Sequence, residues 1–267
     1  MTTTVASSVA AAGARSAFSG IVRDTVIMSK RNLRRISRTP QLIAASSALP
    51  ISFTLMVFYV FGGSVHIPGQ TYVDYLIPAM LVLTPLFGGT TAIAMAEDMA
   101  GGMIERFRSL PIARSAVLAG RTLADTARGA LVVVAVLGVG LLIGFRFHNG
   151  FVPGLAAFGL SLAFSFALAW EMAWIGMTIK DAQAASAAAF VPILIMTFTG
   201  GGLVPIHTLP GWLQAFAHVQ PISVTITTVR ALTQGGPIYH TLWQSLAWIV
   251  GILAVFMSLT VRQYRKV

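Results

Sequence analysis

Charged side chains that could bind another molecule are concentrated in one stretch of the chain, EDMAGGMIERFRSLPIARSAVLAGR, residues 97–121. Apolar runs flank this stretch, and only 10% of the whole chain is charged. Acidic and basic groups in such a cluster can form charge-assisted hydrogen bonds with a partner surface. Gly101 and Gly102 interrupt one helix, and Pro111 ends a second, short helix that begins at Ile104. The pattern predicts a short helix, presented by a loop, that another protein grips.

One carboxyl group lies well inside an apolar run, at Glu171 in AWEMAW. A charge near the centre of a bilayer costs about 3 kcal/mol on insertion scales, so this side chain should face the interior of a helix bundle and be paired or protonated. Glu171 could contact a cationic or hydroxylated substrate, or carry a proton. A hydrogen bond between two helices explains it as well, and the sequence leaves both readings open.

Patterns for nucleotide, metal and nucleophile chemistry are missing from this sequence. No lysine follows the glycines of a phosphate-binding loop, GxGxxG does not occur, and there is no cysteine. The five histidines fall between the apolar runs without metal-ligand spacing: His66, His148, His207, His218 and His240. We therefore expect no catalytic site, no metal site and no cofactor in this chain.

The composition predicts an integral membrane protein. Of the 267 residues 56% are hydrophobic, which is more than one soluble core of this size can bury. The net charge of +10 could suggest nucleic acid, but the basic residues flank the apolar runs. We expect anionic membrane lipids, and no nucleic acid, as the partner of that charge.

Six apolar stretches have about the length that a helix needs to cross a bilayer. They are residues 42–61, 75–96, 123–145, 155–177, 184–204 and 242–261. Asp125 and Arg128 stand near the start of the third stretch, so we expect them to pair at the membrane edge. Sixteen of the eighteen Lys and Arg residues fall on one side of this arrangement. By the positive-inside rule both termini are cytosolic.

The segments outside the spans have distinct expected roles. Residues 1–20 are rich in Ala, Ser and Thr and are expected to be a disordered cytosolic tail. Residues 21–39 carry an apolar stripe beside a basic one, which predicts an amphipathic helix at the lipid headgroups. A plain juxtamembrane linker is the alternative for that segment. The remainder, 40–267, is expected to form one transmembrane domain.

The loop at 205–241 is long for a connection between two spans. Trp212 and Phe216 give it an apolar face after the turn at Pro210, and residues 222–234 could form a second short helix. Glycines 200–202 loosen the backbone just before it. The loop either re-enters the outer leaflet as a hairpin, covered by protein, or floats at the outer interface anchored by Trp212.

Three stretches together resemble the permease subunit of type-2 ABC exporters, in the branch of daunorubicin-resistance permeases. RNLRRISRTPQLI is similar to the family's N-terminal interfacial helix, and EDMAGGMIERFRSLPIARSAVLAGR to its inner loop. GGGLVPIHTLPGWLQAFAHVQPISVTITTVRALTQGG resembles its outer hairpin. The resemblance covers roughly residues 30–265, and Phe107 departs from it where leucine is expected.

The resemblance implies an all-α polytopic protein of six spans, with an interfacial helix, a cytosolic coupling helix and an outer re-entrant-like hairpin. It implies two permease subunits, identical or related, each docked on a separate ABC-type ATPase that holds ATP and Mg. The implied contacts with the ATPase are Arg31, Arg34, Arg35, Glu97, Asp98, Glu105, Arg106, Phe107 and Arg108. Trp212 and Phe216 are expected at the outer gate.

The expected function is export of an amphipathic drug or lipid across a bacterial inner membrane by an ATP-driven machine. Two alternatives stand beside it. One is a secondary transporter or channel that uses Glu171 as its proton or ion site, although no internal repeat supports it. The other is an exporter of polysaccharide or glycolipid from the same superfamily.

Overall fold

The computed structural model describes residues 40–65, 67–88, 92–93, 95–97, 114–179 and 181–266. Within these ranges every regular element is a helix, as the all-α class predicts. The tail at 1–20, the interfacial helix at 21–39 and the coupling helix lie outside the described residues. The elements are α2 (Pro40–Phe61), α3 (Tyr72–Leu83), η1 (Thr84–Gly88), α6 (Arg114–Leu142), α7 (Phe151–Thr178), α8 (Ala182–Thr199), η2 (Ile206–Thr208), α9 (Gly211–Val219), α10 (Pro221–Gln234) and α11 (Tyr239–Lys266).

Five of these helices are long and apolar enough to cross a membrane. They correspond to five of the six predicted spans: Ala44–Phe61, Asp125–Leu142, Phe151–Thr178, Ala182–Thr199 and Tyr239–Gln263. In four of the five no more than 22% of the span is buried inside the protein. Large apolar side chains such as Tyr59, Leu142 and Val250 point outward. Such an apolar outer surface is suited to contact with lipid, because soluble proteins rarely expose large apolar patches to water.

The second predicted span, 75–96, is not one continuous helix. The α-helix α3 ends at Leu83 and tightens into the 3₁₀ helix η1 before helical residues return at 92–93 and 95–97. Pro85 explains the change, because proline has no backbone N–H and its ring clashes with the preceding turn. The prediction placed an apolar helix here correctly but missed the break.

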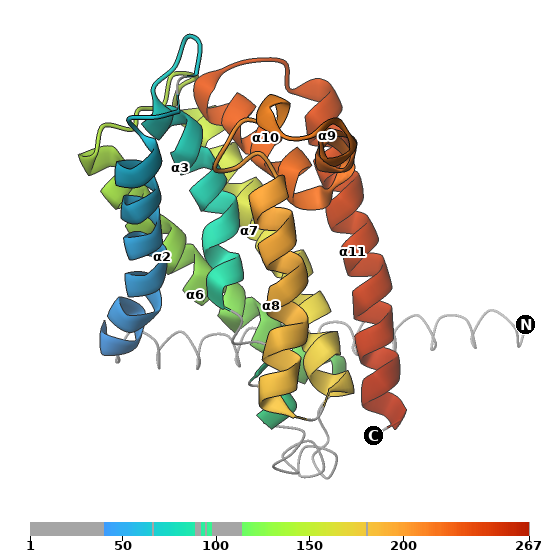
Figure 1. Cartoon of the computed structure of the whole chain (residues 1–267). Coiled ribbons are helices and arrows are strands. Elements are labelled where there is room, and N and C mark those ends of the chain that lie inside the picture. The colour runs from blue at the N-terminus through green and yellow to red at the C-terminus, as the bar shows by residue number, and fades with distance from the viewer. Residues whose placement is uncertain are drawn as a thin grey trace, which may run out of the picture.

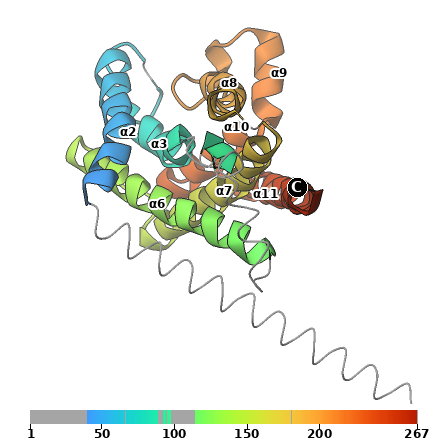
Figure 2. The same ribbon diagram turned by 90° about the horizontal axis from the view of Figure 1, so that it is seen from below.

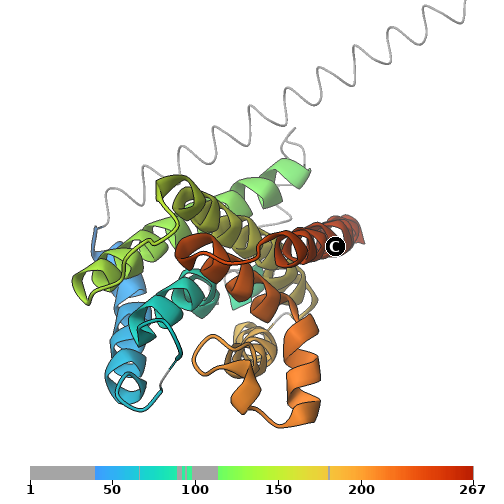
Figure 3. The ribbon, with the colours of Figure 1, turned by 90° about the horizontal axis from the view of Figure 1, so that it is seen from above.

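The described elements form one bundle whose connections alternate between its two ends (Figure 1). The loop after α2, the loop before α7 and the pair α9–α10 lie at one end. The turn between α7 and α8 lies at the other end, as does the end of α11. Seen along the bundle from either end, α3 and η1 lie between α2 and α7 (Figures 2 and 3).

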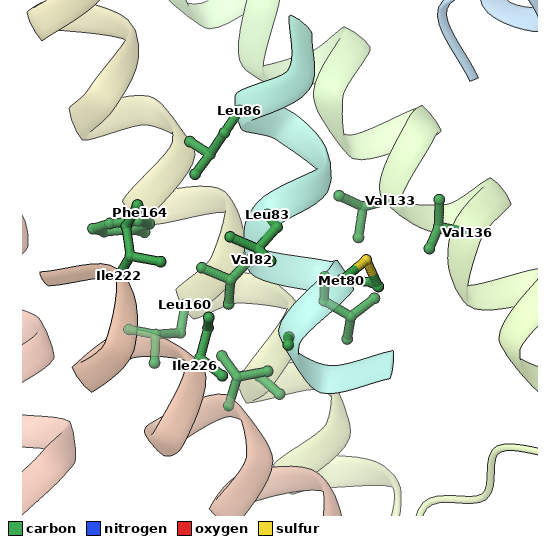
Figure 4. Close-up of a cluster of buried hydrophobic side chains, with 14 of the residues drawn as sticks. Met80, Val82, Leu83, Leu86, Val133, Val136, Leu160, Phe164, Ile222 and Ile226 are labelled. Atoms are coloured by element: carbon green, nitrogen blue, oxygen red, sulfur yellow. The ribbon is translucent and has the colours of Figure 1, made fainter. Parts of the chain in front are cut away.

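The core is built around α3 and α10. All twelve residues of α3 are buried, and so are eleven of the fourteen residues of α10. Figure 4 shows how side chains from four elements meet there: Met80 and Val82 of α3, Val133 of α6, Phe164 of α7 and Ile226 of α10. The helix α10 also packs against α11. The short helix α10 is thus nearly as buried as α3.

A polar cap fixes where α3 begins. The Thr71 hydroxyl accepts a hydrogen bond from the Asp74 backbone N–H at 3.3 Å and donates one to the Asp74 carboxylate at 2.6 Å. The same carboxylate accepts the backbone N–H of Arg146 at 3.3 Å, which ties the loop after α6 to the start of α3. These contacts satisfy donors that a helix N-terminus leaves open.

Candidate functional site

The residues predicted to contact an ATPase lie mostly outside the described part of the chain. This holds for Arg31, Arg34, Arg35, Asp98, Glu105, Arg106, Phe107 and Arg108. Glu97 is described, and its side chain is exposed at the end of the helical residues 95–97. Their role in docking stays a prediction.

The segment that leads to these residues packs tightly on α7. Met95 joins Trp170, Ala173 and Met177 in one buried apolar cluster. A Cβ atom built on Gly176 would lie 2.3 Å from the backbone oxygen of Ala92, which is closer than any real contact. The missing side chain of Gly176 therefore lets the backbone before Glu97 approach α7 directly.

Replacing Gly176 with Ala is expected to lower the free energy of unfolding by about 1–3 kcal/mol, the usual cost of forcing an extra methyl group into a packed site. The clash is with backbone, so no side-chain rotation relieves it. Gly159→Ala on the same helix is the control, because a Cβ there meets nothing within 4 Å. Denaturing-detergent titration of both variants measures the difference, and equal stabilities would contradict the close approach.

Glu171 lies on α7 and its side chain is partly buried. Among the described residues its carboxyl group has no hydrogen bond and no ion pair. The predicted pairing with another helix is therefore not seen in this part of the chain, and the carboxyl group has no assigned structural role.

The predicted outer hairpin consists of two helices with opposite surroundings. On α9, Trp212 is 76% exposed and Phe216 is 43% exposed. The following helix, α10, is the buried one described above. The predicted helix at 222–234 is confirmed, since α10 spans Pro221–Gln234. The helix α10 packs against α3, α7 and α11 inside the bundle, and re-entry of the hairpin into the outer leaflet stays a prediction.

Hydrogen bonds hold α10 at its start. Gln220, which is 2% exposed at the junction of α9 and α10, donates to the backbone oxygen of Met196 at 3.2 Å and to the hydroxyl of Thr199 at 3.1 Å. Trp248 of α11 donates to the backbone oxygen of Val219 at 3.0 Å. The start of α10 is therefore fastened to the end of α8 and to α11.

The middle and the end of α10 are fastened as well. The hydroxyls of Thr228 and Ser245 lie 2.9 Å apart, which joins α10 to α11. At its last turn the backbone N–H of His148 donates to Thr233 at 3.0 Å, and the His148 ring lies 2.7 Å from the amide oxygen of Gln234. The loop before α7 thereby donates hydrogen bonds to the C-terminal end of α10, where backbone carbonyl groups have no partner within the helix.

Arg230 of α10 joins three segments, and sequence reasoning gave it no role. Its guanidinium carbon lies 3.6 Å from the ring centroid of Tyr75. Its NH₂ group donates at 3.1 Å to the backbone oxygen of Tyr75 and at 3.1 Å to that of Gly201. The Tyr75 hydroxyl also donates to the Gly201 oxygen. One arginine therefore ties α10 to α3 and to the turn after α8 (cation–π and hydrogen bonds together).

The turn after α8 can lie between α3 and α10 because it is made of glycine. Gly201 has φ +65°, a conformation that favours glycine. A Cβ on Gly202 would lie 3.1 Å from Ile226 and 3.3 Å from Ala79. The Tyr72 hydroxyl donates a hydrogen bond to the backbone oxygen of Leu203, which follows these glycines, at 3.0 Å. The sequence showed the three glycines but not the helices they touch.

The predicted pairing of Asp125 and Arg128 is confirmed. Arg128 Nη2 lies 3.9 Å from Asp125 Oδ1, and the two side chains keep 20% and 25% of their surface exposed. They are one helical turn apart on α6, where side chains three residues apart lie on the same face. Charges of both signs are thus held near the start of an apolar span.

Comparison with known proteins places this architecture in a family. Residues 23–233 match the family described as ABC-2 type transporter. The chain is 29% identical to the daunorubicin resistance ABC transporter permease protein DrrB1 of Streptomyces coeruleorubidus, over 97% of this chain and 92% of that protein. It is 27% identical to the probable doxorubicin resistance ABC transporter permease protein DrrC of Mycobacterium tuberculosis, over 91% of this chain and 88% of that protein. Because the match includes α2 to α9 and nearly all of α10, the chain belongs to the ABC-2 type transporter family.

Proposed function

We propose that this protein is the membrane permease subunit of an ATP-driven exporter, which moves an amphipathic drug or lipid out of a bacterial cell. The observation that carries the proposal is the family match over residues 23–233, together with relatives named as drug-resistance permeases. The apolar outer surface of the bundle supports a place in the inner membrane. A largely apolar pathway suits a hydrophobic cargo.

The energy comes from a separate ATPase subunit with bound ATP and Mg. The sequence supports this part of the proposal because it has no phosphate-binding loop of its own. The charged stretch at 97–121 and the basic residues at 31–35 provide the contacts that transmit the ATPase movement. Both termini are cytosolic in this arrangement, and a second permease subunit, identical or related, completes the pathway.

In the proposed mechanism the hairpin α9–α10 closes the pathway toward the outside. The helix α10 lies inside the bundle and is held by α3, α8 and α11. Opening toward the outside requires α10 to move relative to α3, and Trp212 and Phe216 move with it because they lie on the adjoining helix α9. These two exposed aromatic side chains form the rim of the outer gate.

Purification tests the proposed partnership. The full chain is expressed with a candidate ABC-type ATPase from the same organism, and ATP hydrolysis by the purified complex is measured while doxorubicin is added as the probe cargo. We expect the two chains to purify together and hydrolysis to rise with doxorubicin. The proposal would be contradicted if the chain purified without the ATPase, or if doxorubicin left the rate of ATP hydrolysis unchanged.

A proton-coupled transporter is the second candidate, because the carboxyl group of Glu171 has no partner within the described ranges. Glu171→Gln separates the two functions. With ATP as the energy source we expect transport in proteoliposomes to stay within about twofold of the unchanged protein, since the substitution keeps the shape and removes only the charge. Loss of transport, together with loss of dependence on an imposed proton gradient, would favour the proton-coupled function.

A further inference from the structure

Two neighbouring cavities between the helices of the bundle differ in the polarity of their lining residues. The first has a volume of about 210 Å³ and lies between α2, η1, α6, α7 and α8. Its lining includes Thr84, Asp125, Arg128 and Ser165. The second has a volume of about 270 Å³, and eight of its nine lining residues are apolar, from α2, α3, η1 and α8. Leu49, Leu86 and Ile193 line both cavities, so the two are adjacent.

Thr84 lines the first cavity, and its hydroxyl group bonds to no described residue. The residue is 2% exposed, and its Oγ1 has no hydrogen-bond partner among the described residues. Several other buried hydroxyls bond to their own helix, as Thr54 does to Pro50 at 2.8 Å and Ser161 to Ala157 at 2.9 Å, whereas Ser47 Oγ, like Thr84 Oγ1, has no partner among the described residues. A buried hydroxyl without a partner costs stability. A polar ligand atom in the cavity would supply the missing bond.

Charges of both signs stand at the same cavity. Asp125 and Arg128 line it from α6, so a bound group meets a carboxylate and a guanidinium within one helical turn. A carboxylate accepts hydrogen bonds from an amine, and a guanidinium donates to a phosphate or hydroxyl oxygen. The lining therefore matches a head group that carries an amine together with a phosphate or hydroxyl oxygen, and it disfavours a head group that is only anionic.

We propose that the two cavities together bind one amphipathic molecule as cargo. Its head group, which carries an amine together with a phosphate or hydroxyl oxygen, lies beside Thr84, Asp125 and Arg128, and its apolar part lies in the second cavity against α2 and α8. Pockets of this size, apolar with a few placed polar groups, are typical of small-molecule sites. The identity of the bound molecule as cargo rests on the proposed function, whereas its binding depends on this chain alone.

Gly129 offers a way to fill the first cavity. A Cβ on Gly129 would lie 3.6 Å from Pro85 and 3.8 Å from Ser165 Oγ, which are ordinary contacts, so a larger side chain extends into the cavity. Gly138 on the same helix is a matched control, because a Cβ there meets nothing within 4 Å. Gly129→Leu therefore removes space from the site, and Gly138→Leu adds the same side chain outside it.

Binding is measured on the full chain in detergent by native mass spectrometry, with lysophosphatidylethanolamine as the zwitterionic probe and lysophosphatidylglycerol of the same chain length as the anionic probe. We expect the zwitterionic probe to bind about tenfold more tightly, the effect of one hydrogen bond to a charged group. Gly129→Leu should abolish this preference, and Gly138→Leu should keep it. Thr84→Val should weaken binding about threefold to tenfold, while Thr54→Val, whose hydroxyl bonds within its own helix, should not.

Equal binding of the two probes, or equal binding by Gly129→Leu and Gly138→Leu, would overturn the site. Circular dichroism on each variant confirms that helix content is unchanged. Transport by the complete complex then tests the cargo assignment: we expect Gly129→Leu to lose transport of the zwitterionic probe, and normal transport with lost binding would overturn it. The binding measurement uses no ATPase, so a failure of the proposed function leaves its result intact.

Discussion

Reversing the charges of Glu105, Arg106 and Arg108 together is expected to lower ATP-driven transport at least about a hundredfold. Removing one partner of a buried, charged contact at an interface costs about 2–5 kcal/mol, and three reversals also create repulsion between like charges. The core around α3 and α10 is formed by other residues, so we expect the protein still to fold and insert. Transport and ATP hydrolysis are measured on the same proteoliposomes.

The control for this prediction is Arg262→Glu, which reverses an exposed charge near the end of α11 at the same end of the bundle as the turn between α7 and α8. We expect it to keep transport within about twofold, because an exposed charge contributes little. Restoring transport by reversing the opposing charges of the ATPase would identify the contact directly. Full transport by the triple variant would show that this stretch does not transmit the ATPase movement.

Arg230→Ala is expected to have the largest effect among substitutions in the described residues. The substitution removes the hydrogen bonds to Tyr75 and Gly201 and the contact with the Tyr75 ring, and it leaves a gap between α3, α10 and the turn after α8. Hydrogen bonds from a charged group contribute about 1.5–3 kcal/mol, and a desolvated cation–π contact about 2 kcal/mol. Because the guanidinium regains its hydration on unfolding, we expect a net loss of about 3 kcal/mol.

Two further variants separate the contacts of Arg230. Arg230→Lys keeps the charge but loses the planar group that reaches both carbonyls, so it should recover less than half of the loss. Arg146→Ala is the matched control: among the described residues this exposed side chain donates only to the backbone oxygens of Leu141, in the last turn of α6, and of Phe145, in the loop after it. Its loss should stay below about 1 kcal/mol. Titration with a denaturing detergent measures all three, and a stable Arg230→Ala protein would refute the role of the contact.

Much of the fold could be predicted from the sequence because membrane helices are recognisable by their length and apolar composition. Five of the six predicted spans are present as long helices. The remaining predicted span, 75–96, shows the limit of that reasoning, because hydropathy contains no information on the change of hydrogen-bonding pattern that Pro85 causes after Leu83. The helix α10 was predicted as a helix, but its polar threonines gave no sign that it would be buried. Those threonines satisfy their hydroxyl groups on their own helix, as Thr225 and Thr233 do at Pro221 and Val229.

The site was harder to predict because its contacts join residues far apart in the chain. Arg230 was counted only as an outer charge, although the apolar run around Tyr75 supplies the ring and carbonyl that it binds. Thr84 carries no sequence signal at all. By contrast, the pairing of Asp125 with Arg128 was predicted correctly, because three residues along a helix fix the distance between two side chains.

In the proposed function a separate ATPase drives transport through this chain, and uptake into sealed proteoliposomes distinguishes that function from proton-coupled transport. The purified protein is reconstituted with and without the ABC-type ATPase, and uptake of doxorubicin is followed with ATP, without ATP and with an imposed proton gradient. We predict uptake only when both the ATPase and ATP are present. Uptake by the chain alone, driven by the proton gradient, would contradict the account.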